Sequence, residues 1–89
     1  MQECTVTVVN KLGLHARAAS KFVNVAKRFS ASVKVEAGGK LVDGKSIMSI
    51  MLLAASQGQK LHLRTDGDDE REAMAAITEL IADRFGEGE

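Results

Sequence analysis

A histidine at the start of a predicted helix is the residue best placed for chemistry. His15 precedes Ala16 and Arg17 and follows a loop that contains Gly13. The first turn of a helix leaves backbone N–H groups without intrahelical acceptors, and the helix dipole favours negative charge beside them. The same dipole disfavours imidazolium and therefore favours the neutral, nucleophilic imidazole. Arg17 adds a guanidinium that can pair with two phosphate oxygens.

The chemistry that these groups fit is phosphoryl transfer at the protein surface. Such a transfer depends on positioning and on electrostatic stabilisation of charge spread over oxygens, so it needs no deep pocket. The N–H groups of Ala16 and Arg17 would hold the phosphate, and His15 would accept it. The alternative is that His15 only caps the helix. The residues alone leave both interpretations open.

Ser46 is a second candidate, because it precedes a short apolar helix. A serine at this position fits a helix N-cap, which contributes ~1 kcal/mol. The helix that follows is too apolar all round to bury every side chain, and methionine is adaptable at binding surfaces. We therefore expect Ile47, Met48 and Met51 to form a docking patch for a partner protein.

The same region satisfies a nucleotide-binding pattern literally. Residues 39–46, GKLVDGKS, match the P-loop motif G-x-x-x-x-G-K-[ST]. A P-loop wraps its intervening residues around phosphates, whereas residues 40–42 read as the returning strand of a hairpin turned at Gly38 and Gly39. Nucleotide-binding domains of this kind also rest on parallel strands with long crossovers. We therefore disfavour a nucleotide-binding enzyme, which stays as an alternative, as does an inert interaction module built on the methionine-rich helix.

Alternating and helical hydrophobic patterns predict the elements that must position these residues. In order, they are a strand at 4–9, a helix at 16–28, strands at 32–36 and 40–43, a short helix that begins after Ser46 and ends by Gln57, a strand at 60–65 and a helix from 68 to about 86. The economical packing is an α+β fold, an open-faced antiparallel four-stranded sheet with three helices on one side. His62 alternates with two leucines and should face solvent on the open side.

Length and composition favour one domain over residues 1–89. The chain has 45% hydrophobic and 27% charged residues, a balance typical of a globular domain. Its single cysteine, Cys4, cannot form an internal disulfide, and no Cys/His cluster has metal-site spacing. The sequence shows no signal peptide and no membrane-spanning run, which favours a cytoplasmic protein.

The charge distribution favours a protein partner. The net charge is zero, yet residues 1–45 hold eight of the twelve Lys and Arg, and residues 46–89 hold nine of the twelve Asp and Glu. Such asymmetry would steer the basic part towards an acidic partner. The neutral total and the 3% aromatic content argue against nucleic-acid binding.

Two motifs carry a resemblance to a known family. Residues 10–19, NKLGLHARAA, closely resemble the active-site signature of the HPr family, the histidine-containing phosphocarriers of the bacterial phosphoenolpyruvate-dependent phosphotransferase system. Residues 43–51, DGKSIMSIM, resemble the family's second motif, and length and element order match over essentially the whole chain. The resemblance implies that Nδ1 of His15 accepts a phosphoryl group from phosphorylated enzyme I and passes it to an enzyme IIA-type domain. His15 would be a carrier, not a catalyst of turnover, and no cofactor or metal is implied.

The resemblance also implies regulation and a docking face. Ser46 would be phosphorylated by an HPr kinase/phosphorylase where the host has one, placing roughly −1.5 to −2 charges beside the apolar patch. Lysines of the first helix would rim the docking face, and we expect a monomer. The expected docking residues are Ala16, Arg17, Ser20, Lys27, Lys45, Ile47, Met48 and Met51.

One position departs from the family pattern. Ala18 stands where many members have proline. A first-turn position tolerates proline without requiring it, and alanine is the stronger helix former, so phosphate chemistry should be unaffected. The sequence does not distinguish a sugar-type from a nitrogen-type phosphotransferase branch.

Overall fold

A computed structural model describes residues 1–87 and contains the predicted elements in the predicted order. They are β1 (Gln2–Thr7), α1 (Ala16–Ala26), β2 (Ser32–Ala37), β3 (Lys40–Asp43), α2 (Ile47–Leu52), β4 (Lys60–Asp66) and α3 (Glu70–Ala82), followed by a short 3₁₀ segment (Arg84–Gly86). No helix within the described residues is both long and apolar enough to cross a bilayer.

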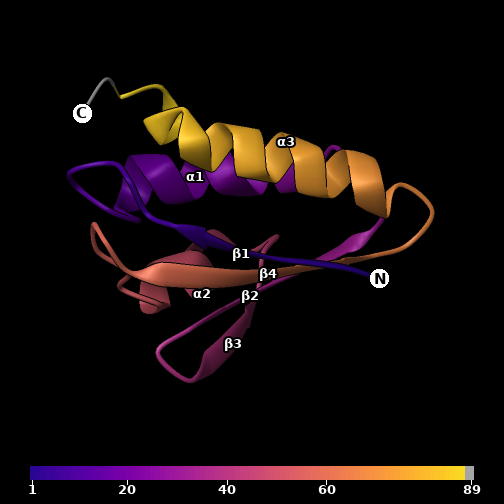
Figure 1. Cartoon of the computed structure of the whole chain (residues 1–89), viewed down its shortest axis with the longest axis horizontal. Helices are drawn as coiled ribbons and strands as arrows, with labels where there is room; N and C mark the ends of the chain where they lie inside the picture. The colour runs from indigo at the N-terminus through magenta and orange to yellow at the C-terminus, as the bar shows by residue number, and fades with distance from the viewer. Residues whose placement is uncertain (88–89) are drawn as a thin grey trace.

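The four strands form one antiparallel sheet in the order β1-β4-β2-β3 (Figure 1). The tight turn at Gly38 and Gly39 pairs β2 with β3, because both glycines adopt the positive φ that such a turn requires. On the open face His62 lies opposite Thr5 of β1 and Glu36 of β2. Its ring is within 3.0 Å of both Thr5 Oγ1 and Glu3 Oε1, so the predicted open-face position is confirmed.

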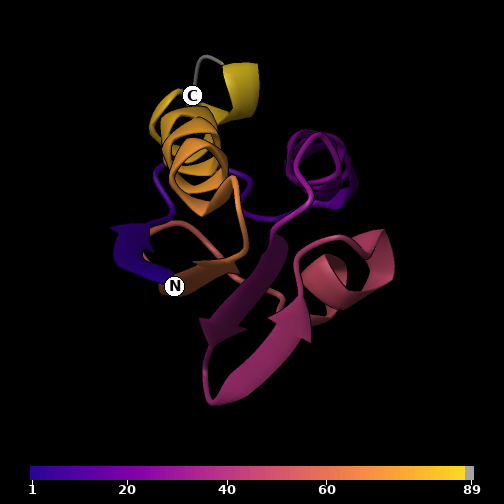
Figure 2. The ribbon, with the colours of Figure 1, turned by 90° about the vertical axis from the view of Figure 1, so that its right-hand side faces the viewer.

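The helices cover the other face of the sheet, as Figure 2 shows. α1 and α3 lie side by side over the strands, and α2 packs against α1 and β3. Between the layers lies one hydrophobic core, whose largest fully buried side chains include Phe22, Ile50, Leu61, Ile77 and Phe85. The predicted α+β architecture with an open-faced antiparallel sheet is confirmed.

Several element boundaries differ from the sequence prediction. The short helix expected to end by Gln57 ends at Leu52. The predicted strand 4–9 is β1 at Gln2–Thr7, because Val8 leaves the ladder and bonds instead to Gly58 and Gln59 in the turn before β4. The predicted helix 16–28 ends at Ala26. The last helix ends at Ala82 rather than near 86, because Arg84 and Phe85 adopt a left-handed conformation, with φ of 55° at both, that no right-handed helix contains.

Candidate functional site

His15 is the N-cap residue of α1, with an extended backbone at φ −73° and ψ 178°. Its carbonyl accepts the first helical hydrogen bond, 2.8 Å from the N–H of Ala19, but its side chain makes no capping bond. The His15 side chain therefore does not cap the helix, although its backbone occupies the N-cap position. The imidazole, with 29% of its side chain exposed, is available at the mouth of the helix.

The loop before His15 is held against the segment that follows α2. Gly13 has φ of +68°, and a Cβ on it would lie 2.4 Å from the carbonyl oxygen of Ala55. The N–H of Leu14 donates a 2.9 Å hydrogen bond to that same oxygen. Only glycine fits such a close backbone approach at this φ, so the glycine of the motif places the histidine.

An open hollow surrounds the His15 ring. It joins the start of α1 to the turn that follows α3, which Figure 1 shows side by side. Arg17 and Lys21 of α1 supply its positive charge, and Arg17 is exposed. The lining residues are Leu12, His15, Ala16, Arg17, Lys21, Gly86 and Glu87. A phosphoryl group on the ring would thus meet the helix N-terminus and at least one cation.

Glu87 is a site residue that the sequence prediction missed. Its carboxylate is hydrogen-bonded to Nε2 of His15, and it also accepts a 2.9 Å hydrogen bond from Nδ2 of Asn10. Burial raises the pKa of Glu87, but the hydrogen bonds from Asn10 and His15 and the nearby charge of Lys21 outweigh it, so the pKa lies below its ordinary value. The carboxylate is therefore ionised beside the imidazole at neutral pH.

A left-handed turn at residues 84–86 brings Glu87 to His15. Arg84, Phe85 and Gly86 all have positive φ, and the fully buried Phe85 ring anchors the turn in the core. Nζ of Lys21 donates a 2.6 Å hydrogen bond to the Phe85 carbonyl. Asn10 completes the connection, because it is fully buried and its Nδ2 also donates to the Gly13 carbonyl at 2.8 Å.

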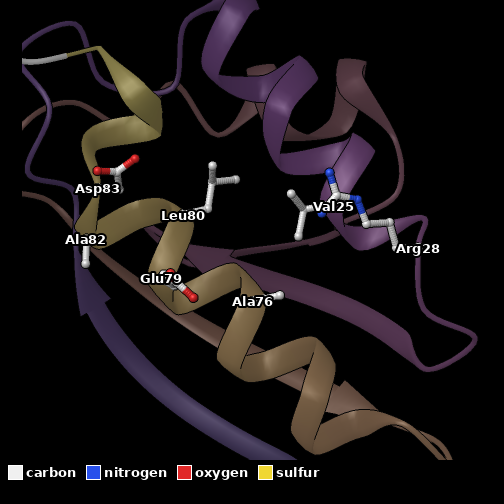
Figure 3. A pocket seen from close by; sticks show the side chains of 7 residues that line it. All are labelled: Val25, Arg28, Ala76, Glu79, Leu80, Ala82 and Asp83. Atoms are coloured by element: carbon white, nitrogen blue, oxygen red, sulfur yellow. The ribbon is translucent and has the colours of Figure 1, made fainter.

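A second hollow lies between α1 and α3, away from His15 (Figure 3). Figure 3 shows Arg28 on the α1 side and Glu79 and Asp83 on the α3 side. Its lining residues are Val25, Arg28, Ala76, Glu79, Leu80, Ala82 and Asp83, so this hollow contains neither histidine of the chain. The hollow at His15 is therefore the candidate site.

Comparisons with known proteins identify the family of the chain. A family model described as "PTS HPr component phosphorylation site" matches residues 2–83. The chain belongs to the HPr family. It is 54% identical to the phosphocarrier protein HPr of Pseudomonas aeruginosa over 90 residues, covering 100% of both chains. Phosphocarriers of this family serve the phosphotransferase system, so the chain is a phosphocarrier of that system.

Solved HPr structures have the same fold. The crystal structure of HPr-C-His from Thermoanaerobacter tengcongensis matches with a TM-score of 0.94 and 49% identity, covering 98% of each chain. A crystal structure described as an HPr dimer from the same organism matches with a TM-score of 0.79 and 49% identity, covering 98% of this chain and 100% of that one.

The second HPr motif forms a strand and a capped helix, not a P-loop. Residues 40–43 are strand β3, paired with β2, so the backbone cannot wrap a phosphate there and the nucleotide-binding alternative is wrong. Ser46 is the N-cap of α2, and its Oγ accepts a 3.3 Å hydrogen bond from the N–H of Ser49. The predicted cap is confirmed. Within residues 1–87, no hydrogen bond joins Ser46 to His15.

The apolar residues expected to dock partners are exposed on α2. Met48 is 76% exposed, and Ile47 and Met51 are exposed on the same short helix. Leu12 and Leu52 are also exposed, although the sequence prediction did not include them among the docking residues.

The expected basic and polar docking residues differ in exposure and in their distance from His15. Ser20 is half-buried one turn after Ala16. Lys27 is exposed and lies just past the other end of α1, about 16 Å along the helix from Ala16. Nζ of Lys45 donates a 2.8 Å hydrogen bond to the Phe29 carbonyl, so it fastens the loop after α1. The docking role of these residues stays a prediction.

Proposed function

We propose that this chain carries a phosphoryl group on Nδ1 of His15, taken from phosphorylated enzyme I and delivered to an enzyme IIA-type domain. The observation that carries the proposal is the environment of the imidazole. One ring nitrogen, Nε2, is engaged by the Glu87 carboxylate, and the ring stands at the N-terminus of α1 in a hollow that also contains Arg17. Nδ1 is then the ring nitrogen with a free lone pair.

In the transfer, His15 is the acceptor and the neighbouring groups bind the phosphate. The Nδ1 lone pair forms a bond to phosphorus as the bond from phosphorus to the donor atom breaks, and that electron pair stays with the donor. The first-turn N–H groups of Ala16 and Arg17 and the Arg17 guanidinium stabilise the oxygen charge. The reverse sequence releases the group to the acceptor, so His15 carries phosphate without independent turnover.

The test is phosphate acceptance from phosphoenolpyruvate and enzyme I. We expect an acid-labile, base-stable phosphoadduct in the wild type and in His62→Ala, which removes the other histidine of the chain, and no adduct in His15→Ala. Arg17→Lys keeps the charge but loses the paired guanidinium contacts, so acceptance should slow about tenfold. A stable adduct in His15→Ala would overturn the assignment.

The surface beside this site, with an apolar part on α2, is proposed to dock enzyme I and the enzyme IIA-type domain. It comprises Ile47, Met48 and Met51 of α2, which are exposed, and Ala16, Arg17 and Ser20 of α1; Lys27 and Lys45 are proposed at its rim. Exposed apolar groups of this kind lose water contact on docking and so favour association. Met48→Ser should raise the KM of enzyme I for this protein without changing its fold.

Phosphorylation of Ser46 by an HPr kinase/phosphorylase is proposed as a restraint on that docking. The phosphate would sit at the start of α2 directly before Ile47, where its charge repels an acidic partner while the N-cap position tolerates it. Ser46→Asp should therefore raise the KM for enzyme I, with Ser46→Ala as the neutral comparison. An unchanged KM in Ser46→Asp would contradict the proposal.

The proposed setting is the cytoplasm, with the protein as a monomer. Cys4 is a free thiol, consistent with a reducing compartment. A related HPr has been crystallised as a dimer, so the oligomeric state needs its own measurement. Sedimentation equilibrium at micromolar concentration should give the mass of one chain.

A further inference from the structure

Two side chains behind His15 form a chain of hydrogen bonds that the transfer step itself does not use. Asn10 Nδ2 donates to Glu87 at 2.9 Å, and the Glu87 carboxylate is bonded to Nε2 of His15. In the sequence, Glu87 lies 77 positions after Asn10 and 72 positions after His15, so both contacts exist only in the folded protein.

The orientation of the Asn10 amide follows from its neighbours. Both groups that it faces, the Gly13 carbonyl and the Glu87 carboxylate, are acceptors, so the amide nitrogen must point towards them. Its oxygen Oδ1 is buried without a partner among residues 1–87. A fully buried amide with one unsatisfied atom costs stability, which makes a role for the side chain beyond packing worth testing.

Glu87 can accept but not donate, which determines the state of the imidazole. The ring nitrogen that faces an ionised carboxylate must carry the proton, so neutral His15 is the Nε2–H tautomer and Nδ1 holds the lone pair. The charged groups around the ring are Arg17 and Lys21 of α1 and Glu87 of the turn. Of these three, Glu87 alone is negative, and its hydrogen bond is directed at one ring nitrogen.

We propose that Asn10 and Glu87 are positioning residues that hold His15 in the Nε2–H tautomer before transfer and keep that proton on Nε2 afterwards. The inference rests on the proposed function. When Nδ1 bonds to phosphorus the ring becomes cationic, and the Glu87 carboxylate compensates that charge, so no proton has to move in either direction. A cationic ring is also the better leaving group, so the same contact keeps the phosphoryl group transferable at higher pH.

The first experiment reads the tautomer directly and requires no phosphoryl transfer. Long-range ¹H–¹⁵N correlation spectra of the unphosphorylated protein should show Nε2–H as the dominant tautomer. In Glu87→Leu the ratio of the two tautomers should fall about tenfold, because a charge-assisted hydrogen bond is lost. Glu87→Gln keeps an acceptor oxygen and should recover part of the ratio. Glu72→Gln, on the exposed face of α3, should leave it unchanged.

The second experiment measures spontaneous loss of the phosphoryl group against pH. In Glu87→Gln and in Asn10→Ala the pH midpoint of dephosphorylation should move about one unit to lower pH, because the proton on Nε2 is held less firmly. A merely structural role would leave this profile in place. Far-UV circular dichroism identifies any variant that fails to fold. If Asn10→Ala does not fold, Glu87→Gln, whose side chain is nearly isosteric with glutamate, provides the test alone.

The outcomes separate the inference from the proposed function. A tautomer ratio unchanged in folded Glu87→Leu would overturn the positioning role even if His15 is phosphorylated normally. A shifted ratio with no phosphate acceptance would support the hydrogen-bond chain and overturn the carrier assignment. An unchanged pH profile in folded Glu87→Gln would overturn the claim that Glu87 retains the proton after transfer.

Discussion

The carboxylate of Asp69 accepts a 2.8 Å hydrogen bond from the backbone N–H of Ala31. It accepts a second, of 2.9 Å, from the N–H of Ser30. Although Asp69 is the N-cap of α3, its side chain caps nothing in its own helix and instead fastens the loop between α1 and β2 to the start of α3. Gly67 permits this approach, because a Cβ there would lie 2.7 Å from the Ala31 Cα.

Removing the Asp69 charge should weaken the dependence of the free energy of unfolding on pH in the acid range. The hydrogen bonds from Ser30 and Ala31 lower the pKa of Asp69 below its ordinary value of 3.8. A carboxyl whose pKa is lowered by folding contributes stability above its unfolded pKa and loses it as pH falls through the folded pKa. Asp69→Asn should therefore lower the urea midpoint at neutral pH, and the difference from wild type should shrink as pH falls below 3.8.

The exposed neighbour Asp68 supplies the control for that titration. Asp68→Asn should change the urea midpoint less than Asp69→Asn does at every pH. If the deficit of Asp69→Asn were as large in strong acid as at neutral pH, the hydrogen-bonded charge would not be its source.

Ala54→Gly should stabilise the protein. Ala54 follows Leu53, the C-cap of α2, and has φ of 50°, a left-handed conformation in which the Cβ of an L-residue is crowded. Glycine avoids that crowding, and after the greater freedom of glycine in the unfolded chain is subtracted, we expect a gain of about 0.5–1 kcal/mol in urea unfolding. Ala75→Gly, on the exposed side of right-handed α3, should instead cost about 1 kcal/mol. Destabilisation by both glycines would contradict the strain at Ala54.

The elements and the first half of the site could be predicted because their causes are local. The alternation of β4, the glycine pair of the hairpin and the serine before α2 each act within a few residues. His15 and Arg17 were predicted together for the same reason, since a helix start is a local feature.

The remainder of the site depends on tertiary contacts that leave no local pattern. Glu87 follows a turn that the sequence predicts as helix, and its partner Asn10 reads as an ordinary loop residue. The residue types of Arg84 and Phe85 also do not predict their positive φ, which is uncommon outside glycine. Tertiary contacts, the burial of the Phe85 ring and the hydrogen bond from Lys21, hold this conformation. Only Gly86 hinted that the helix ends there.

Gly13→Ala should disrupt the loop that holds His15 more than its backbone conformation alone would. The added Cβ must displace the carbonyl of Ala55, which lies 2.4 Å from its ideal position. Gly39→Ala is a matched control, because Gly39 also has a positive φ but no atom lies within 4 Å of the corresponding Cβ. Gly39→Ala should cost about 1 kcal/mol, and Gly13→Ala about 2–4 kcal/mol together with slower phosphate acceptance. Equal costs in urea unfolding would show that the contact with Ala55 is easily relieved.

Lys21→Met should loosen the left-handed turn without unfolding the domain. Nζ of Lys21 donates to the Phe85 carbonyl at 2.6 Å, and methionine keeps the apolar stem of the side chain while removing that donor. The N–H groups of Gly86 and Glu87, bonded to Asp83 and Arg84 at 3.0 Å, should exchange with solvent deuterium about tenfold faster. Amides in β4 should exchange at nearly the wild-type rate, because global stability changes little. Lys27→Met, at the opposite end of α1, should leave the exchange of Gly86 and Glu87 unchanged. Equal acceleration in both variants would mean that lost positive charge, and not the hydrogen bond to Phe85, frees the turn.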